Sequence, residues 1–218
     1  MSVITPARLL KRGRGTQKGD TLIEVLFAFA VLSLVIIGAL SIMNQGTLAS
    51  QRSLETTLVR EEIDGQATTL RFLHDAYVAK YQSGAVYAPN TPANEWATMV
   101  SKLSATSSTP FGGVTSCPTL PPPGSFILDP VNAHFMGIDT LLKRSTTFAQ
   151  LVYDPTGAIF KESDGIWIEA IKSPNTETDP NKQNVTYIDF HINACWDAPG
   201  NGPPMTIGTI VRLYEPLN

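Results

Sequence analysis

The chain has 218 residues, 43% of them hydrophobic, which is enough for one domain with a proper core plus one further element. Its net charge of −3 is unevenly distributed, because residues 1–19 carry five basic side chains and no acidic one, which leaves −8 for residues 20–218. An acidic body argues against a general nucleic-acid-binding surface on the bulk of the protein.

Residues 1–19 form a short basic head with little tendency to be helical. Its basic side chains are Arg8, Lys11, Arg12, Arg14 and Lys18. Pro6 and the glycines at positions 13, 15 and 19 oppose a stable helix there. Beyond this head no proline occurs from Asp20 to Ala88, so the sequence allows a long helix.

A long apolar run follows the basic head. Val25–Met43 is nineteen residues interrupted only by two serines and one glycine. As a helix it is about 28 Å long, close to the thickness of a bilayer core. Because basic flanks stay in the cytoplasm, we expect one membrane span with the N-terminus inside and the residues after about 45 outside.

A cleavable secretory signal is the alternative interpretation of this run. Its apolar region would be shorter and would be followed by a small-residue A-x-A-like cleavage site. Ala39-Leu40-Ser41 and Leu48-Ala49-Ser50 are poor versions of that site. The length of the run therefore favours a retained membrane helix.

An amphipathic pattern follows the apolar run. Apolar residues recur at steps of three and four, at Val59, Ile63, Ala67, Leu70, Leu73 and Tyr77. Charged residues fall between them, as on the solvent face of a helix. We predict one helix from about 21 to 81, apolar all round over 20–45, apolar on one face over 46–82, and ending before Ser83-Gly84.

Residues 83–218 are predicted to form a globular head. Residues 83–125 are rich in Pro, Ser and Thr, and only 94–103 has helix character, with Asn94 as a candidate N-cap. Segments rich in β-branched and aromatic residues predict strands at 147–154, 165–171, 184–195 and 206–215. Short connections between them favour an antiparallel sheet. The predicted fold class is α+β, with the amphipathic half of the helix packed on one face of the sheet.

The residues at the end of the basic head resemble the N-terminus of type IV prepilins. That family has a short basic leader that ends in glycine, then a Thr-Leu-Ile-Glu-Val stretch that opens a long apolar run. The matching residues here are Gly19, Asp20, Thr21, Leu22, Ile23, Glu24 and Val25. The motif covers only the N-terminal part of the chain, whereas the remainder agrees with the family in its layout.

The resemblance implies a pilin-like fold and a processing step. In the family, a membrane aspartyl peptidase (prepilin peptidase) cuts on the cytoplasmic side after the glycine, and the new N-terminus is usually methylated. Gly19 and Asp20 would then flank the cut, residues 1–19 would be the removed leader, and Glu24 would be the fifth residue of the mature chain. The mature chain would lie in membrane lipid until it joins other pilin subunits in a filament. No cofactor is implied.

Glu24 stands at the edge of the apolar run, where a charge needs an explanation. An unpaired charge costs roughly 2.5 to 3.5 kcal/mol at the centre of a membrane helix. In a filament of stacked helices, the Glu24 carboxylate can pair with the α-amino group of a neighbouring mature subunit, which sets the register more than it adds stability. The alternative is a membrane-edge glutamate that reaches water.

Asp20 departs from the family pattern, in which the residue after the glycine is usually Phe. An acid beside the new amine partly neutralises that amine within its own chain and so competes with Glu24 of a neighbour. This leaves methylation of Asp20 open. Residues other than Phe at this position are familiar among minor pilins and pseudopilins, so we expect a low-copy subunit.

Cys117 and Cys195 are the only cysteines, and both fall on the side predicted to be outside. An even number in an oxidising compartment predicts a disulfide, and pilins often have one. By the chain-entropy estimate it would be worth about 4 kcal/mol. Two separate thiols are the alternative where no oxidase operates.

Other candidate sites carry weaker patterns. His74, His134 and His191 lack metal-ligand spacing and are predicted to be packing or surface residues. Residues 174–184 carry oxygen ligands but not the calcium-loop pattern, so we predict a solvated turn. The sequence also has no phosphate-binding GxxxxGK[ST] loop and no GxSxG nucleophile motif, and we predict no enzymatic activity.

Three functions remain open at this point. The leading one is a structural subunit of a type IV pilus or a related secretion pseudopilus. The second is an adhesive or DNA-capturing module at the filament tip, although no motif supports nucleic acid or a surface ligand as a partner. The third is a membrane-anchored surface protein that never polymerises. Cleavage after Gly19 separates the first two from the third, and ligand binding by the head separates the first from the second.

Overall fold

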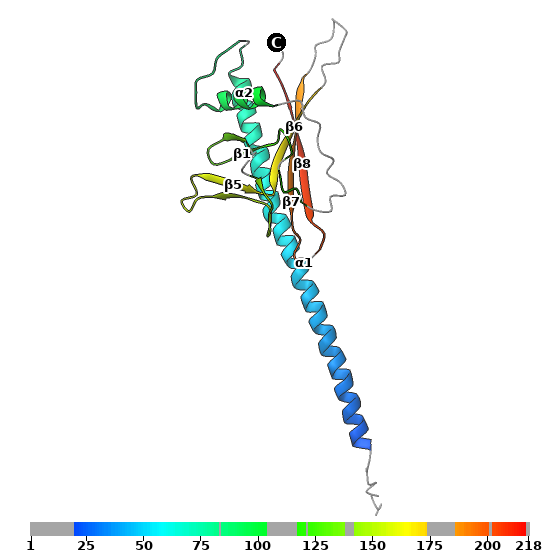
Figure 1. The fold of residues 1–218 in the computed structure, drawn as a ribbon. Coiled ribbons are helices and arrows are strands. Elements are labelled where there is room, and N and C mark those ends of the chain that lie inside the picture. Colours follow the sequence, from blue (N-terminus) through cyan, green and yellow to red (C-terminus); the bar gives the residue numbers. More distant parts are fainter. Residues whose placement is uncertain are drawn as a thin grey trace, which may run out of the picture. The chain divides into compact units, whose positions relative to one another are not determined.

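The computed structural model describes residues 20–82, 84–103, 117–120, 122–137, 142–173, 186–200 and 202–216. The chain divides into two compact units, Met1–Thr47 and Leu48–Asn218, and each is described by itself. The described residues form two helices followed by eight strands (Figure 1). The fold class is therefore α+β, as the sequence predicts.

Helix α1 (Asp20–Ala79) is the long N-terminal helix predicted for residues 21 to 81. Throughout the first unit, its described side chains are exposed from position 21 to position 47. In the second unit the helix is amphipathic and covers one face of the sheet (Figure 1). The buried apolar residues there are Val59, Ile63, Ala67, Leu70 and Leu73, which confirms the predicted face.

Helix α2 (Pro92–Lys102) begins two residues earlier than predicted, and its N-cap is Thr91. The prediction of Asn94 as the N-cap is wrong. Thr91 has an extended backbone, and its hydroxyl accepts a hydrogen bond of 3.3 Å from the Asn94 backbone N–H. Pro92 suits the first helical position, where its missing N–H leaves no bond unmade. The helix buries Ala93, Trp96 and Met99.

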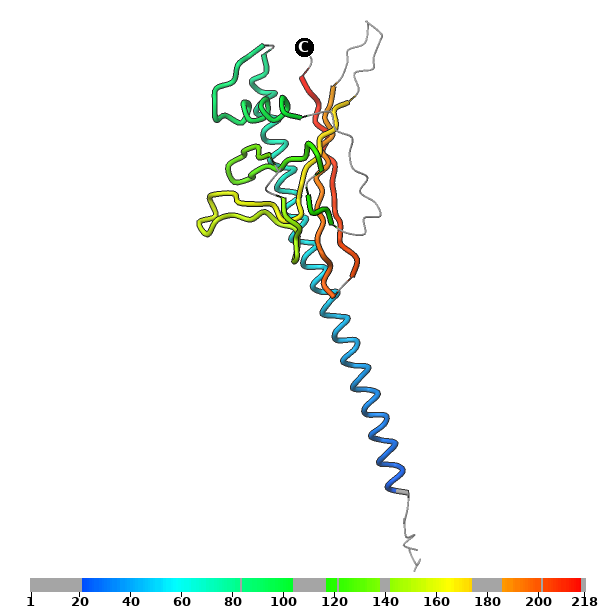
Figure 2. The backbone as a smooth tube through the Cα atoms, in the orientation of Figure 1, coloured from blue at the N-terminus to red at the C-terminus, as the bar shows by residue number. Residues whose placement is uncertain are grey.

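The main sheet has five strands in the order β2-β1-β6-β7-β8, and all neighbouring pairs are antiparallel. Its strands are β1 (Phe126–Asp129), β2 (His134–Gly137), β6 (Ile166–Lys172), β7 (Tyr187–Trp196) and β8 (Met205–Tyr214). Figure 2 shows β7 and β8 running side by side, and they pair over ten residues each. The sequence predicts the last three strands but misses β1 and β2.

A second, three-stranded sheet has the order β3-β5-β4. Its strands are β3 (Leu142–Lys143), β4 (Gln150–Tyr153) and β5 (Phe160–Asp164). Strand β4 is the observed part of the strand predicted at 147–154, whereas β3 and β5 were not predicted. The β3–β5 pair is parallel, so the expectation of antiparallel pairing holds for the main sheet but not for this one.

Gly165 joins the two sheets. It lies between β5 and β6 with φ at 74°, a left-handed conformation that favours glycine. Its backbone N–H donates to the Lys143 carbonyl and its carbonyl accepts from the Cys195 N–H, both at 2.8 Å. One residue thus links β3 of the small sheet to β7 of the large one.

The core of the second unit lies between the buried face of α1, α2 and the main sheet. Aromatic rings connect these layers. The Phe190 ring lies 5.6 Å from the Trp96 ring and 6.2 Å from the Phe126 ring, measured between centroids. Edge-to-face contacts of this kind add to the stabilisation that burial provides.

Candidate functional sites

The first candidate site is the apolar half of α1. An 18-residue window of this helix has a mean hydropathy of 2.8, and none of that window is buried. By length and composition the helix is able to cross a membrane. An apolar surface of this extent is not stable in water, so it needs lipid or protein around it.

Glu24 lies near the start of that exposed helical segment. Its neighbours Ile23 and Val25 are 69% and 51% exposed. Among the described residues, no hydrogen bond or ion pair reaches the Glu24 carboxylate, which leaves the expected partner to come from elsewhere. Of the predicted processing residues, Asp20 is the first residue of α1, whereas Gly19 lies outside the described residues.

The disulfide between Cys117 and Cys195 is present, which confirms that prediction. The Cα atoms are 5.5 Å apart, and both side chains are buried. The next residue, Trp196, faces α1, because its indole Nε1 donates to Glu55 Oε2 at 3.0 Å. Side chains alternate along a strand, so Cys195 points to the opposite face of the sheet. The disulfide therefore ties the connection between α2 and β1 to the face that α1 does not cover.

Two of the three histidines, His134 and His74, make structural contacts between elements of the second unit. His134 Nδ1 lies 2.9 Å from Glu95 Oε2, which joins β2 to α2. His74 Nε2 lies 2.9 Å from the Tyr214 carbonyl oxygen, which joins α1 to β8. The segment 174–184, predicted to be a solvated turn, lies outside the described residues.

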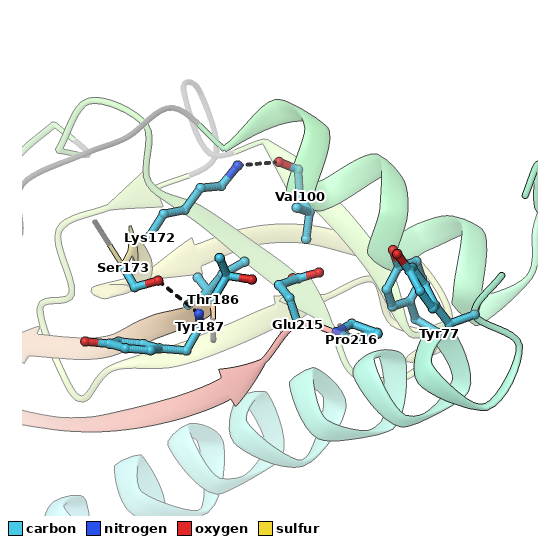
Figure 3. Close-up of a pocket in the computed structure, with 10 residues that line it drawn as sticks. Tyr77, Val100, Lys172, Ser173, Thr186, Tyr187, Glu215 and Pro216 are labelled. Carbon is cyan, nitrogen blue, oxygen red and sulfur yellow. Dashed lines mark hydrogen bonds between the residues drawn. The ribbon is translucent and has the colours of Figure 1, made fainter. Parts of the chain in front are cut away.

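A second candidate site, which sequence reasoning missed, is a cavity of about 340 Å³ in the second unit. Its walls come from the end of α1, from α2 and from the adjoining ends of β6, β7 and β8 (Figure 3). Tyr77 and Tyr81 stand on the α1 side with their ring centroids 5.5 Å apart. Lys172, Ser173, Thr186 and Glu215 line the sheet side.

Glu215 lines this cavity with a buried carboxylate oxygen, Oε1, that lacks a hydrogen-bond partner among the described residues. Its backbone N–H donates to the Thr186 carbonyl at 2.9 Å, which continues the β7–β8 ladder and fixes the residue beside the cavity. Burial raises the pKa of this carboxyl, although the charges of His74 and Lys172 act to lower it.

Two neighbouring groups of the cavity each have a hydrogen-bond partner already. Lys172 Nζ donates to the Val100 carbonyl at 3.2 Å, as Figure 3 shows. Ser173 Oγ accepts from the Tyr187 N–H at 3.0 Å. Burial is the main cause that raises the pKa of Tyr77 to about 12, and the charge of Glu215 acts in the same direction. This phenol therefore stays protonated at neutral pH.

No sequence signal marks this cavity. Its lining is drawn from segments spread along the sequence from Tyr77 to Pro216, and only the pairing of β7 with β8 and the packing of α1 bring them together. Single tyrosines and a glutamate near the end of a strand are common in any protein. Comparison with protein-family models, with curated proteins and with solved structures finds no match.

Proposed function

We propose that this chain is a low-copy structural subunit of a type IV pilus or a related pseudopilus. The observation that carries the proposal is the exposed, apolar half of α1, which directly follows a basic head ending in Gly19 and contains Glu24 near its start. Prepilin peptidase would cut between Gly19 and Asp20. The fold supports the proposal, since a long helix packed on an antiparallel sheet is a pilin-like layout.

The apolar half of α1 gives the chain two successive environments. Before assembly, membrane lipid covers it, with the N-terminus on the cytoplasmic side and the head outside. After assembly, the same surface packs against the apolar helices of neighbouring subunits. Burial of apolar side chains in both environments explains why one helix serves as anchor and as filament core.

Glu24 supplies the register of the assembled state in this proposal. Its carboxylate pairs with the α-amino group at Asp20 of a neighbouring mature subunit. Two opposite charges in an apolar bundle are tolerated together and are costly apart, so the pair selects one stagger between helices. The chain acts as a structural component and performs no reaction in this account.

Mass spectrometry of the N-terminal peptide tests the processing step. The protein is expressed in a cell that has an active prepilin peptidase, and the membrane and filament fractions are digested and analysed. We expect a mature terminus at Asp20 and its loss in Gly19→Ala, whereas Gly15→Ala in the same head should be cut normally. An intact Met1 terminus in the wild-type protein would contradict the proposal and would favour a membrane anchor that never polymerises.

A further inference from the structure

We propose that the cavity between the end of α1, α2 and the ends of β7 and β8 binds a neutral sugar residue. This activity goes beyond the proposed structural role, because it would make the head a carbohydrate-binding module. The cavity volume of about 340 Å³ lies in the lower part of the range of small-molecule sites. A single sugar ring with part of a second is a suitable occupant for such a volume.

Unsatisfied polar atoms gather at this end of the head. Among the described residues, the buried side-chain polar atoms without a partner are Trp96 Nε1 and Glu215 Oε1. Both residues are close to Tyr77, whose ring lies 6.4 Å from that of Trp96 and whose pKa responds to the charge of Glu215. Buried polar groups are normally paired, so the unpaired Glu215 Oε1 in the lining of the cavity indicates a missing polar partner.

The charges of the lining select an uncharged partner. Glu215 presents a carboxylate that only accepts hydrogen bonds, and Lys172 presents an ammonium that only donates them. A cationic ligand would meet Lys172 and an anionic ligand would meet Glu215. A sugar has hydroxyl groups that donate to the carboxylate and accept from the ammonium, without adding a charge to the site.

The remaining walls suit the apolar face of a sugar ring. Tyr77 and Tyr81 offer aromatic surface with a polar hydroxyl at its edge. Val100 and Ile188 add aliphatic surface, and Thr186 adds a further hydroxyl. Aromatic and aliphatic side chains beside convergent polar groups are usual in the wall of a ligand site.

Saturation-transfer NMR on the full chain tests this proposal. The protein is placed in phosphatidylcholine nanodiscs, because sugar-headed detergents would compete for the cavity. The probes are the methyl β-glycosides of glucose, galactose and N-acetylglucosamine, together with lactose and chitobiose. Glucosamine and glucuronic acid are the charged counterparts. Monosaccharides and disaccharides together show whether one ring suffices or whether a chain of sugars is needed.

Variants connect the signal to the cavity. Glu215→Gln keeps the shape of the side chain and removes its charge, Tyr81→Leu removes an aromatic wall, and Lys172→Met removes the opposite charge. Asp64→Asn and Phe72→Leu are matched controls, because both residues are exposed on α1 and do not line this cavity. A melting curve for each variant identifies any that fail to fold, and the conclusion then rests on the others.

We expect transfer to at least one neutral glycoside in the wild type and in both controls, and affinity at least about tenfold weaker in the folded cavity variants. Three results would overturn the proposal. They are no transfer to any neutral glycoside, equal transfer in the cavity variants, and preferential binding of glucosamine or glucuronic acid. Each result is independent of whether the chain is processed after Gly19, so failure here leaves the filament proposal standing.

Discussion

The side chain of Gln66 completes the hydrogen bonding of Leu128 in the main sheet. Gln66 Nε2 donates to the Leu128 carbonyl at 2.8 Å, and Gln66 Oε1 accepts from the Leu128 N–H at 3.0 Å. Strand β1 pairs with β6 only at Phe126, opposite Ile168, so farther along this edge α1 takes the place of the neighbouring strand. Helix and sheet are therefore joined by hydrogen bonds as well as by apolar packing.

Gln66→Ala should destabilise the second unit by about 2 kcal/mol, because it leaves two buried backbone groups without partners. The measurement is denaturant unfolding of the solubilised chain, followed by tryptophan fluorescence. Gln51→Ala, at an exposed position on the same helix, should change the stability by no more than about 0.5 kcal/mol. Equal stability of the two variants would show that the Gln66 bonds contribute nothing.

Gly165→Ala should destabilise the chain by at least about 2 kcal/mol, since it combines left-handed strain with a steric clash. An added Cβ would collide with the carbonyl oxygen of Cys195. Cys195 lies on β7, and its N–H donates to the Gly165 carbonyl. Gly157→Ala is the control, because Gly157 has a similar φ of 72° but open space around it. Gly157→Ala should lower the stability by only about 1 kcal/mol, the cost of a left-handed backbone for a residue with a side chain. A smaller loss for Gly165→Ala than for Gly157→Ala would contradict the role given to that contact.

Loss of the disulfide should lower the free energy of unfolding by about 4 kcal/mol, because the bond closes a long loop in the unfolded chain. The two cysteines are 78 positions apart in the sequence. The comparison is between wild-type protein and the double variant Cys117→Ser, Cys195→Ser, each unfolded with and without reductant. Reductant should destabilise only the wild type. Full alkylation of both cysteines in unreduced native protein would contradict the bond.

The extent of α1 and its buried face could be predicted because the sequence patterns that mark them are strong. The absence of proline, the uncharged run and the steps from Val59 to Tyr77 all depend on helix geometry alone, and the structure confirms the helix and its buried face. The disulfide followed from counting cysteines in the part of the chain predicted to lie on the outer side of the membrane. These predictions require no knowledge of which strands pair.

Strand β1, the burial of Gln66 and the cavity could not be predicted, because each depends on tertiary contacts. Strand β1 has only four residues, all of them buried, so it has no alternating pattern to distinguish it from a loop in a proline-rich region. Gln66 is fully buried although its type is usually exposed, and only its position opposite Leu128 explains that. The cavity at Glu215 likewise exists only after α1, α2 and the main sheet have packed together.

Glu62→Gln should make the stability of the protein less dependent on pH. Burial raises the pKa of Glu62, although a backbone hydrogen bond at Leu151 lowers it. A raised pKa in the folded state means that the ionised carboxyl is destabilising above that pKa, and that this penalty disappears as the pH falls through the ordinary pKa that the glutamate has in the unfolded chain. The variant should therefore exceed the wild type in stability at pH 7, by at most about 1 kcal/mol because the group is partly solvated.

Unfolding curves at pH 7 and pH 4 for the wild type and Glu62→Gln check the direction of this stability difference. The advantage of Glu62→Gln should shrink between the two pH values. Asp64→Asn is the control, since Asp64 is exposed on the same helix and should show no comparable change. An advantage that grows as the pH falls would show that Glu62 is stabilised in its ionised form.

The filament proposal depends most directly on Glu24. Glu24→Ala should leave membrane insertion intact or improve it, because it removes a charge from the apolar boundary. Its incorporation into filaments should fall, because a neighbouring amine then lacks its partner. If Asp20 already neutralises the amine within its own chain, the loss is partial, and Asp20→Phe should make assembly depend more strongly on Glu24.

The decisive measurement is the amount of tagged protein in sheared surface filaments relative to the membrane fraction, at matched expression. In the Asp20→Phe background, Glu24→Ala should lower this ratio by at least about tenfold, since breaking a buried ion pair costs several kcal/mol. Glu61→Ala, an acid-to-alanine change at an exposed position of the same helix, should leave the ratio unchanged. Equal ratios for Glu24→Ala and its parent, with Asp20 kept and with Asp20→Phe, would contradict the account.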